Sequence, residues 1–140
     1  MSATIQVAFD CVDPHRQCAF WAAVLGYEVP DVADIVERAR AAGYATDDDT
    51  SVFDGKVVWK TVAACSDPSA VGPRLLFQQV PEDKVAKNRV HLDVRMAEDA
   101  REAEVARLTA LGATWLHEGR FGPEIWITMA DPEGNEFCVS

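Results

Sequence analysis

A short turn-and-strand pattern that occurs twice limits what this chain can fold into more than any other feature. Residues 131–139 read Asp-Pro-Glu-Gly-Asn-Glu-Phe-Cys-Val, and residues 67–77 contain Asp-Pro, then Gly-Pro, then Arg-Leu-Leu-Phe. In both segments an Asp-Pro turn and a glycine precede a short apolar run, which is typical of a β-turn that leads into a strand. This repeat within 140 residues indicates a duplicated supersecondary unit.

The duplication extends upstream of the turn in both halves. A strand candidate at 5–12 precedes a helix candidate that ends at Gly26, and a strand candidate at 89–96 precedes one that ends at Gly112. The offset between the halves falls from 86 residues at the helix ends to 64 at the Asp-Pro turns. The first half therefore holds about 22 extra residues between its helix and its turn.

Residue patterns predict the individual elements of each half. Asp13 as N-cap and Pro14 as first helical residue predict a helix over 14–25. In the extra segment, at about 31–45, we expect a helix capped by Asp31 that packs through Val32, Ile35, Val36 and Ala39, followed by a charged loop at 47–49. The other predicted elements are strands at 57–65, 74–80, 113–117, 124–129 and 134–139 and a helix at 99–111. The order β-α-β-β-β, twice, is typical of an α+β fold.

Size, charge and cysteine spacing limit the class of protein. One domain over 1–140 is the natural interpretation, with module one at about 1–81 and module two at about 88–140. The net charge of −10 disfavours nucleic acid and anionic membranes as partners. Four cysteines without metal-finger spacing predict reduced thiols. With no leader pattern and no apolar run approaching the ~18 residues of a membrane span, we expect a cytoplasmic protein.

Alternation along the strands predicts one polar face in each half. In the first strand, Gln6, Ala8 and Asp10 lie opposite the apolar residues, and in its counterpart His91, Asp93 and Arg95 do so. Under the duplication Gln6 corresponds to His91. A wall that mixes polar and aromatic side chains suits a small-ligand cavity. The predicted cavity residues are Gln6, Leu76, Gln78, His91, Thr128 and Cys138, with Trp126 and Trp59 as aromatic surfaces.

Several of these residues have a second interpretation. His91 and Asp93 are candidates for proton transfer, but each also fits a structural hydrogen bond or ion pair. Cys138 fits a packed thiol as well as a ligand or nucleophile. A tryptophan stacks on a planar ligand or fills the core.

The chain resembles the glyoxalase/bleomycin-resistance, or vicinal oxygen chelate, superfamily, in its small glyoxalase-like branch. The resemblance rests on Phe20-Trp21 and Leu25-Gly26-Tyr27 in the first helix, on the Asn88–Val94 strand, and on the terminal Asp-Pro-Glu-Gly-Asn-Glu-Phe-Cys. It implies two βαβββ modules that form a curled eight-stranded mixed sheet around a cavity, often in a homodimer. It also implies a divalent metal at four positions, which fall on Gln6, Leu76, His91 and Cys138.

These four residues do not favour a catalytic metal. Leu76 has no donor atom and Gln6 is neutral, which leaves His91 as a weak metal candidate. We therefore expect a small-molecule binding protein of the bleomycin-resistance type, without a cofactor. The alternative is a lyase, isomerase or dioxygenase with an altered site, with or without a divalent metal, in which His91 and Asp93 transfer protons. A second alternative is a non-catalytic interaction module that uses the extra helix.

Overall fold

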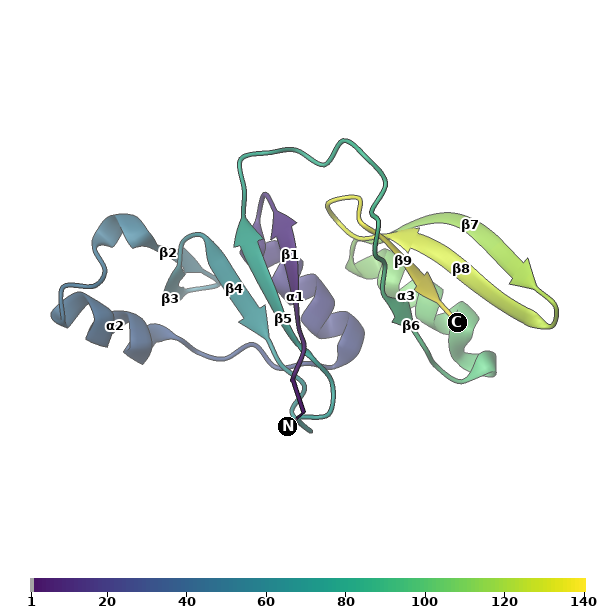
Figure 1. Ribbon diagram of the computed structural model, residues 1–140, viewed down its shortest axis with the longest axis horizontal. Coiled ribbons are helices and arrows are strands. Elements are labelled where there is room, and N and C mark those ends of the chain that lie inside the picture. Colours follow the sequence, from purple (N-terminus) through teal and green to yellow (C-terminus); the bar gives the residue numbers. More distant parts are fainter. Residues whose placement is uncertain (1) are drawn as a thin grey trace. The chain divides into compact units, whose positions relative to one another are not determined.

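The computed structural model of the chain describes residues 2–140, which form two compact units (Figure 1). Unit one comprises residues 2–22 and 26–83, and unit two comprises residues 23–25 and 84–140. No helix among residues 2–140 is long and apolar enough to cross a membrane.

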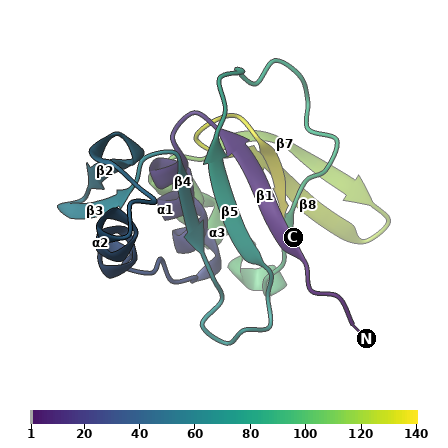
Figure 2. The same ribbon diagram turned by 60° about the vertical axis from the view of Figure 1, so that its left-hand side comes forward.

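Unit one contains the longer series of elements, including α1 as far as Ala22. They are β1 (Gln6–Cys11), α1 (Pro14–Leu25), α2 (Ala33–Ala41), the 3₁₀ helix η1 (Asp47–Asp49), β2 (Thr50–Phe53), β3 (Lys56–Trp59), β4 (Val62–Cys65) and β5 (Arg74–Gln79). The first and last strands, β1 and β5, pair in parallel, and β4 pairs antiparallel with the other edge of β5. Figures 1 and 2 show β5 between its two neighbours. β2 and β3 form a separate hairpin.

The predicted strand at 57–65 is interrupted where it changes partner. The Lys60 backbone N–H donates to the Asp49 carbonyl at 2.9 Å, on the side of β2, whereas the Thr61 carbonyl accepts from the Gln79 N–H at 2.8 Å, next to β5. β3 and β4 are therefore two halves of one strand. This division, together with the additional strand β2, gives nine strands among the described residues where seven strand ranges were predicted.

Helix α1 has the predicted bounds and covers one face of the β1–β5 pair. The Asp13 carboxylate accepts from the Arg16 N–H at 3.0 Å, and Gly26 ends the helix with a φ of 66°. Trp21 packs against Phe9 with ring centroids 5.4 Å apart, and Phe9 stacks on Phe77 at 5.1 Å. The alternation predicted for β1 is confirmed, because Phe9 faces this core and Gln6 faces away.

The extra segment contains the predicted helix, but one of its packing residues was wrong. Val36 is fully buried, whereas Ile35 is 50% exposed, because the contact face of a nine-residue helix is narrow. Asp31 accepts from the Ala33 N–H at 3.0 Å, although Val32 occupies the N-cap position. The predicted charged loop at 47–49 is instead the 3₁₀ helix η1, closed by reciprocal bonds between Thr46 and Asp49.

Unit two repeats the plan of unit one without the insertion. Its elements are β6 (Asp93–Val94), the 3₁₀ helix η2 (Glu98–Ala100), α3 (Arg101–Leu111), β7 (Thr114–Phe121), β8 (Glu124–Ala130) and β9 (Glu136–Val139). The sheet order is β6-β9-β8-β7, so the first and last strands again pair in parallel. The fully buried side chains of Leu108, Met129, Phe137 and Val139 form its core.

Two strand predictions in unit two were wrong in length. The strand predicted at 89–96 shortens to Asp93–Val94, because a side chain rather than backbone pairing holds the residues before it. The strand predicted at 113–117 runs on to Phe121, since pairing with β8 continues past Gly119. The α+β class and the two βαβββ modules are confirmed, with sheets that do not close.

Candidate functional site: a groove on the sheet of unit two

A cavity of about 620 Å³ lies on one face of the unit-two sheet. The lining positions alternate along β6, β8 and β9, as expected for side chains that share a face. They come from β6, β7, β8, β9 and the flanking residues, namely Lys87, His91, Asp93, Arg95, Leu116, His117, Glu124, Trp126, Thr128, Glu136, Cys138 and Ser140. We refer to this cavity as the groove.

A row of polar side chains crosses the floor of the groove from one edge of the sheet to the other. Asp93 on β6 is in register with Cys138 on β9, Cys138 with Thr128 on β8, and Thr128 with His117 on β7. Thr128 and Cys138 are buried, and Asp93 and His117 are exposed. The row therefore offers hydroxyl, thiol, carboxylate and imidazole groups to one ligand.

A β-bulge brings His117 into this row. Trp115 pairs with Met129 and His117 with Thr128, so Leu116 is an extra residue on β7. A bulge changes the alternation of the side chains, and here Leu116 and His117 both line the groove. The sequence pattern did not reveal His117 as a site residue, because strict alternation places it on the face of Trp115, away from the groove.

Trp126 is the largest side chain that lines the groove, and it lies across Gly119. These two residues are register partners on β8 and β7. A Cβ atom added to Gly119 would stand 2.2 Å from Cε2 and 2.4 Å from Cζ2 and Nε1 of Trp126. The absence of a side chain at position 119 therefore lets the indole approach the backbone of β7 closely.

His91 forms a tight cluster with two members of the polar row, Asp93 and Cys138. His91 Nε2 lies 3.2 Å from Asp93 Oδ1, and one potential donor atom from each of the three residues lies within 4.8 Å of the others. Cys138 Sγ is 3.6 Å from Thr128 Oγ1. Burial raises the pKa of the Cys138 thiol, and the Asp93 carboxylate adds to this effect, so the thiol is protonated at neutral pH.

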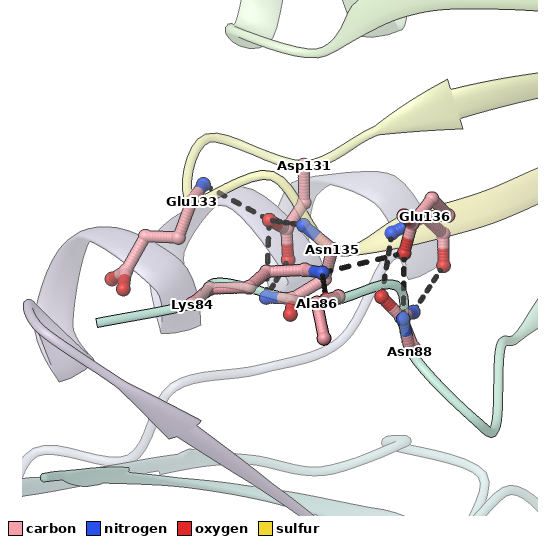
Figure 3. A network of polar contacts seen from close by, with 7 residues as sticks. All are labelled: Lys84, Ala86, Asn88, Asp131, Glu133, Asn135 and Glu136. Atoms are coloured by element: carbon pink, nitrogen blue, oxygen red, sulfur yellow. Dashed lines mark hydrogen bonds and ion pairs between the residues drawn. The ribbon is translucent and has the colours of Figure 1, made fainter. Parts of the chain in front are cut away.

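The turn before β9 holds the groove strand in place through one buried carboxylate (Figure 3). Asp131 Oδ1 accepts from the backbone N–H groups of Glu133 at 2.9 Å and Asn135 at 3.0 Å. The Asn135 carbonyl accepts from the Asp131 N–H at 2.9 Å, and Gly134 takes a positive φ of 85°. The Asp-Pro-Glu-Gly-Asn motif is thus a local device that sets where β9 begins.

The sequence profile described as a glyoxalase-like domain matches residues 6–140. The chain belongs to this family. No curated protein matches the sequence of this glyoxalase-like chain significantly.

Solved structures with the same fold include enzymes and resistance proteins. One is a glyoxalase/bleomycin resistance protein/dioxygenase family enzyme from Burkholderia phytofirmans PsJN, with 13% identity, a TM-score of 0.64, and coverage of 96% of this chain and 94% of that one. Another is the fosfomycin resistance protein FosX from Listeria monocytogenes, with 10% identity, a TM-score of 0.64, and coverage of 99% and 92%. Protein ATC0852 from Agrobacterium tumefaciens matches at 16% identity and a TM-score of 0.65, with coverage of 99% and 96%. At these identities the likeness establishes the glyoxalase-like fold alone.

The predicted site residues of this glyoxalase-like chain fall into two groups. His91, Asp93, Trp126, Thr128 and Cys138 come together in the groove of unit two.

The predicted residues of unit one form a separate set. Gln6, Leu76 and Gln78 share the face of β1–β5 that lies opposite the core. There the Gln6 side-chain oxygen accepts from the Arg74 guanidinium, and Gln78 Nε2 donates to Asp10 at 2.9 Å. Trp59 is half-buried in β3, where its carbonyl contacts His15 Nε2 at 2.7 Å.

The donor set does not fit the four-ligand metal site that the superfamily implies. Leu76 provides no donor atom, and the Gln6 side-chain oxygen already accepts a hydrogen bond from Arg74. The Cys138 thiol is protonated, and His91 Nε2 contacts Asp93. A divalent ion would have to displace these interactions and remove the thiol proton, for at most three donors within unit two.

Proposed function

We propose that the groove of unit two binds a small, planar, partly apolar molecule without a catalytic metal. The position of Trp126 across Gly119 carries this proposal, because a close-packed indole beside a row of polar groups combines apolar area with fixed hydrogen-bonding groups. The uncharged Cys138 thiol and the Thr128 hydroxyl suit neutral polar atoms of the ligand. The His91–Asp93 pair at the edge suits a more polar substituent.

The test compares two tryptophans on the same sheet. Aromatic amides and acids of one or two rings are titrated into the wild-type protein and into Trp126→Ala and Trp115→Ala, with calorimetry or ligand-observed NMR as readout. Trp126→Ala should weaken binding by about 1–3 kcal/mol through lost buried area. Trp115 is 53% exposed and does not line the groove, so Trp115→Ala should leave affinity unchanged. Equal losses in both variants, or no binding of any compound, would contradict the proposal.

The second candidate function is lyase, isomerase or dioxygenase chemistry at the same groove. The observation that favours it is the His91–Asp93 contact of 3.2 Å, since a carboxylate that orients an imidazole is a common arrangement for proton transfer. The named enzyme from Burkholderia phytofirmans shows that this fold also carries catalysis.

Solvent deuterium distinguishes an acid/base enzyme from a binding protein. Compounds that bind the groove are incubated with the protein in D₂O and followed by proton NMR. An enzyme of the proton-transferring class exchanges a carbon-bound proton of its ligand, and His91→Asn abolishes the exchange while retaining binding. A pure binding protein leaves every carbon-bound proton in place.

We also propose that the protein is a cytoplasmic homodimer, in keeping with its reduced cysteines and its superfamily resemblance. The alternative of an interaction module assigns α2 as the contact surface. Light scattering after size-exclusion chromatography tests the dimer, and loss of the dimer on replacing Ile35, the exposed apolar residue of α2, by Glu would place α2 in the contact.

A further inference from the structure

The segment before β6 is held along β9 without being a strand. Backbone pairing between the two begins at Leu92, whose carbonyl accepts from the Cys138 N–H at 3.0 Å. At Glu136, two residues earlier on β9, the partner is the side chain of Asn88 (Figure 3). Asn88 Nδ2 donates to the Glu136 carbonyl at 2.9 Å, and Asn88 Oδ1 accepts from the Glu136 N–H at 3.2 Å.

This pair of bonds imitates a strand residue. A primary amide carries a donor and an acceptor in one plane, as a peptide group does, so one asparagine satisfies both backbone groups of Glu136. Backbone groups without a partner are costly when water cannot reach them. Asn88 therefore extends the edge of β9 beyond the end of the two-residue strand β6.

The Glu136 carboxylate strengthens the same attachment. Its Oε2 atom accepts from the Asn88 backbone N–H at 3.2 Å and lies 3.6 Å from Lys84 Nζ. Burial opposes the charged form of Glu136, but hydrogen bonds from its own backbone and from Asn88, with the charges of Lys84 and Lys87, lower its pKa below the ordinary value. The carboxylate is therefore ionised at neutral pH and holds residues 84–88 to β9.

We propose that Asn88 is a positioning residue of the groove. It fixes residues 87–91, which carry Lys87 and His91 and which we call the wall of the groove. Lys87 precedes Asn88 directly, His91 follows it by three residues, and both line the groove. The backbone pairing that begins at Leu92 holds only the far end of this wall. The ligand-binding meaning of this inference rests on the proposed function of the groove.

The experiment compares two variants, in each of which one side-chain amide is replaced by a carboxylic acid. Asn88→Asp removes the donor to the Glu136 carbonyl and brings a second carboxylate beside Glu136. The control, Gln79→Glu, makes the same change in unit one, where Gln79 Nε2 donates to the Val12 carbonyl at 3.0 Å. The readouts are the ring resonances of the three histidines in NMR spectra and the rate at which iodoacetamide alkylates Cys138, mapped by mass spectrometry.

Asn88→Asp should shift the His91 resonances, leave those of His15 in place and accelerate Cys138 alkylation by about tenfold or more, because the wall opens locally. Gln79→Glu should change neither readout. Unchanged His91 resonances and an unchanged alkylation rate in folded Asn88→Asp, or equal changes in Gln79→Glu, would overturn the inference. If Asn88→Asp does not fold, Asn88→Ala carries the same comparison without the added charge.

Neither readout uses a ligand. A groove that binds no compound would refute the proposed function and leave the positioning role standing. Conversely, a groove that binds ligand equally well in a folded Asn88→Asp protein with unmoved His91 resonances would refute only the role of Asn88.

Discussion

Gly119 determines the shape of the groove through the side chain that it lacks. A methyl group at this position would overlap the Trp126 ring, with contacts of 2.2–2.4 Å to three of its atoms. We predict that Gly119→Ala rotates Trp126 off β7 and destabilises the protein by about 1–3 kcal/mol, as overpacking does. The measurements are chemical denaturation and the indole N–H resonance of Trp126. Gly122→Ala is a poor control, since Gly122 has a φ of 56° and strain would add to the effect.

The turn at Asp67 should contribute less to the stability of the protein as the pH falls. Asp67 accepts from the Ser69 hydroxyl at 2.7 Å and from the backbone N–H groups of Gly72 and Ser69, each at 2.8 Å. These bonds lower its pKa from 3.8 to about 2. Because the folded value lies below the unfolded one, the stabilisation is complete above about pH 4 and is lost as the pH falls toward about 2.

Denaturant unfolding of wild type and Asp67→Asn across this pH range tests the prediction. The wild-type advantage in free energy of unfolding should be largest near neutral pH and should shrink between pH 4 and pH 2, because the asparagine does not titrate. A difference that stays constant through the acid range would mean that the carboxylate contributes by packing rather than by charge.

At the scale of the element, two neighbouring residues of α2 should contribute differently to the free energy of unfolding. Val36 is fully buried and Ile35 is 50% exposed. Val36→Ala should therefore lower the free energy of unfolding by about 1–3 kcal/mol through a cavity, whereas Ile35→Ala should change it by less than about 0.5 kcal/mol. Thermal and urea unfolding of both variants provide the comparison. Equal effects would mean that α2 packs through a different face.

Sequence patterns predicted elements that carry their own boundary signals. Asp13, Pro14 and Gly26 set α1 locally, and alternation set the faces of β1 and β9. The strand β2 was not predicted, because Thr50–Phe53 is short and becomes a strand only through pairing with β3.

The same difference between local and pairing-dependent signals explains why only part of the site was predicted. The positions of Trp126, Thr128 and Cys138 follow from simple alternation. The position of His117 depends on a bulge, and the role of Asn88 depends on its side chain taking the place of backbone pairing. Such features depend on the neighbouring strand, so the periodicity of one segment does not contain them.

At the scale of the whole molecule, metal addition tests the metal-dependent form of the enzyme alternative. The transferred positions offer one imidazole, a protonated thiol, an engaged amide and a leucine, so we predict weak binding of divalent ions. Stabilisation by a bound ion grows with its affinity, and a weak site at micromolar metal gives little. Nickel, zinc, manganese or iron(II) should barely change the melting temperature, and elemental analysis should find far less than one ion per chain. One tightly held ion, lost in His91→Ala, would favour the enzyme.

In both units the first strand pairs with the last. This strand order has a consequence while the chain is synthesised on the ribosome. Unit one has all its strands once Gln79 has emerged, whereas the central strand β9 of unit two is made some sixty residues later. Until then β8 lacks the neighbour that covers its inner edge, and β6 has no partner at all in unit two. Nascent chains thus combine a first half whose strands all have partners with an unpaired β-edge, the kind of surface that chaperones cover and that joins with copies of itself.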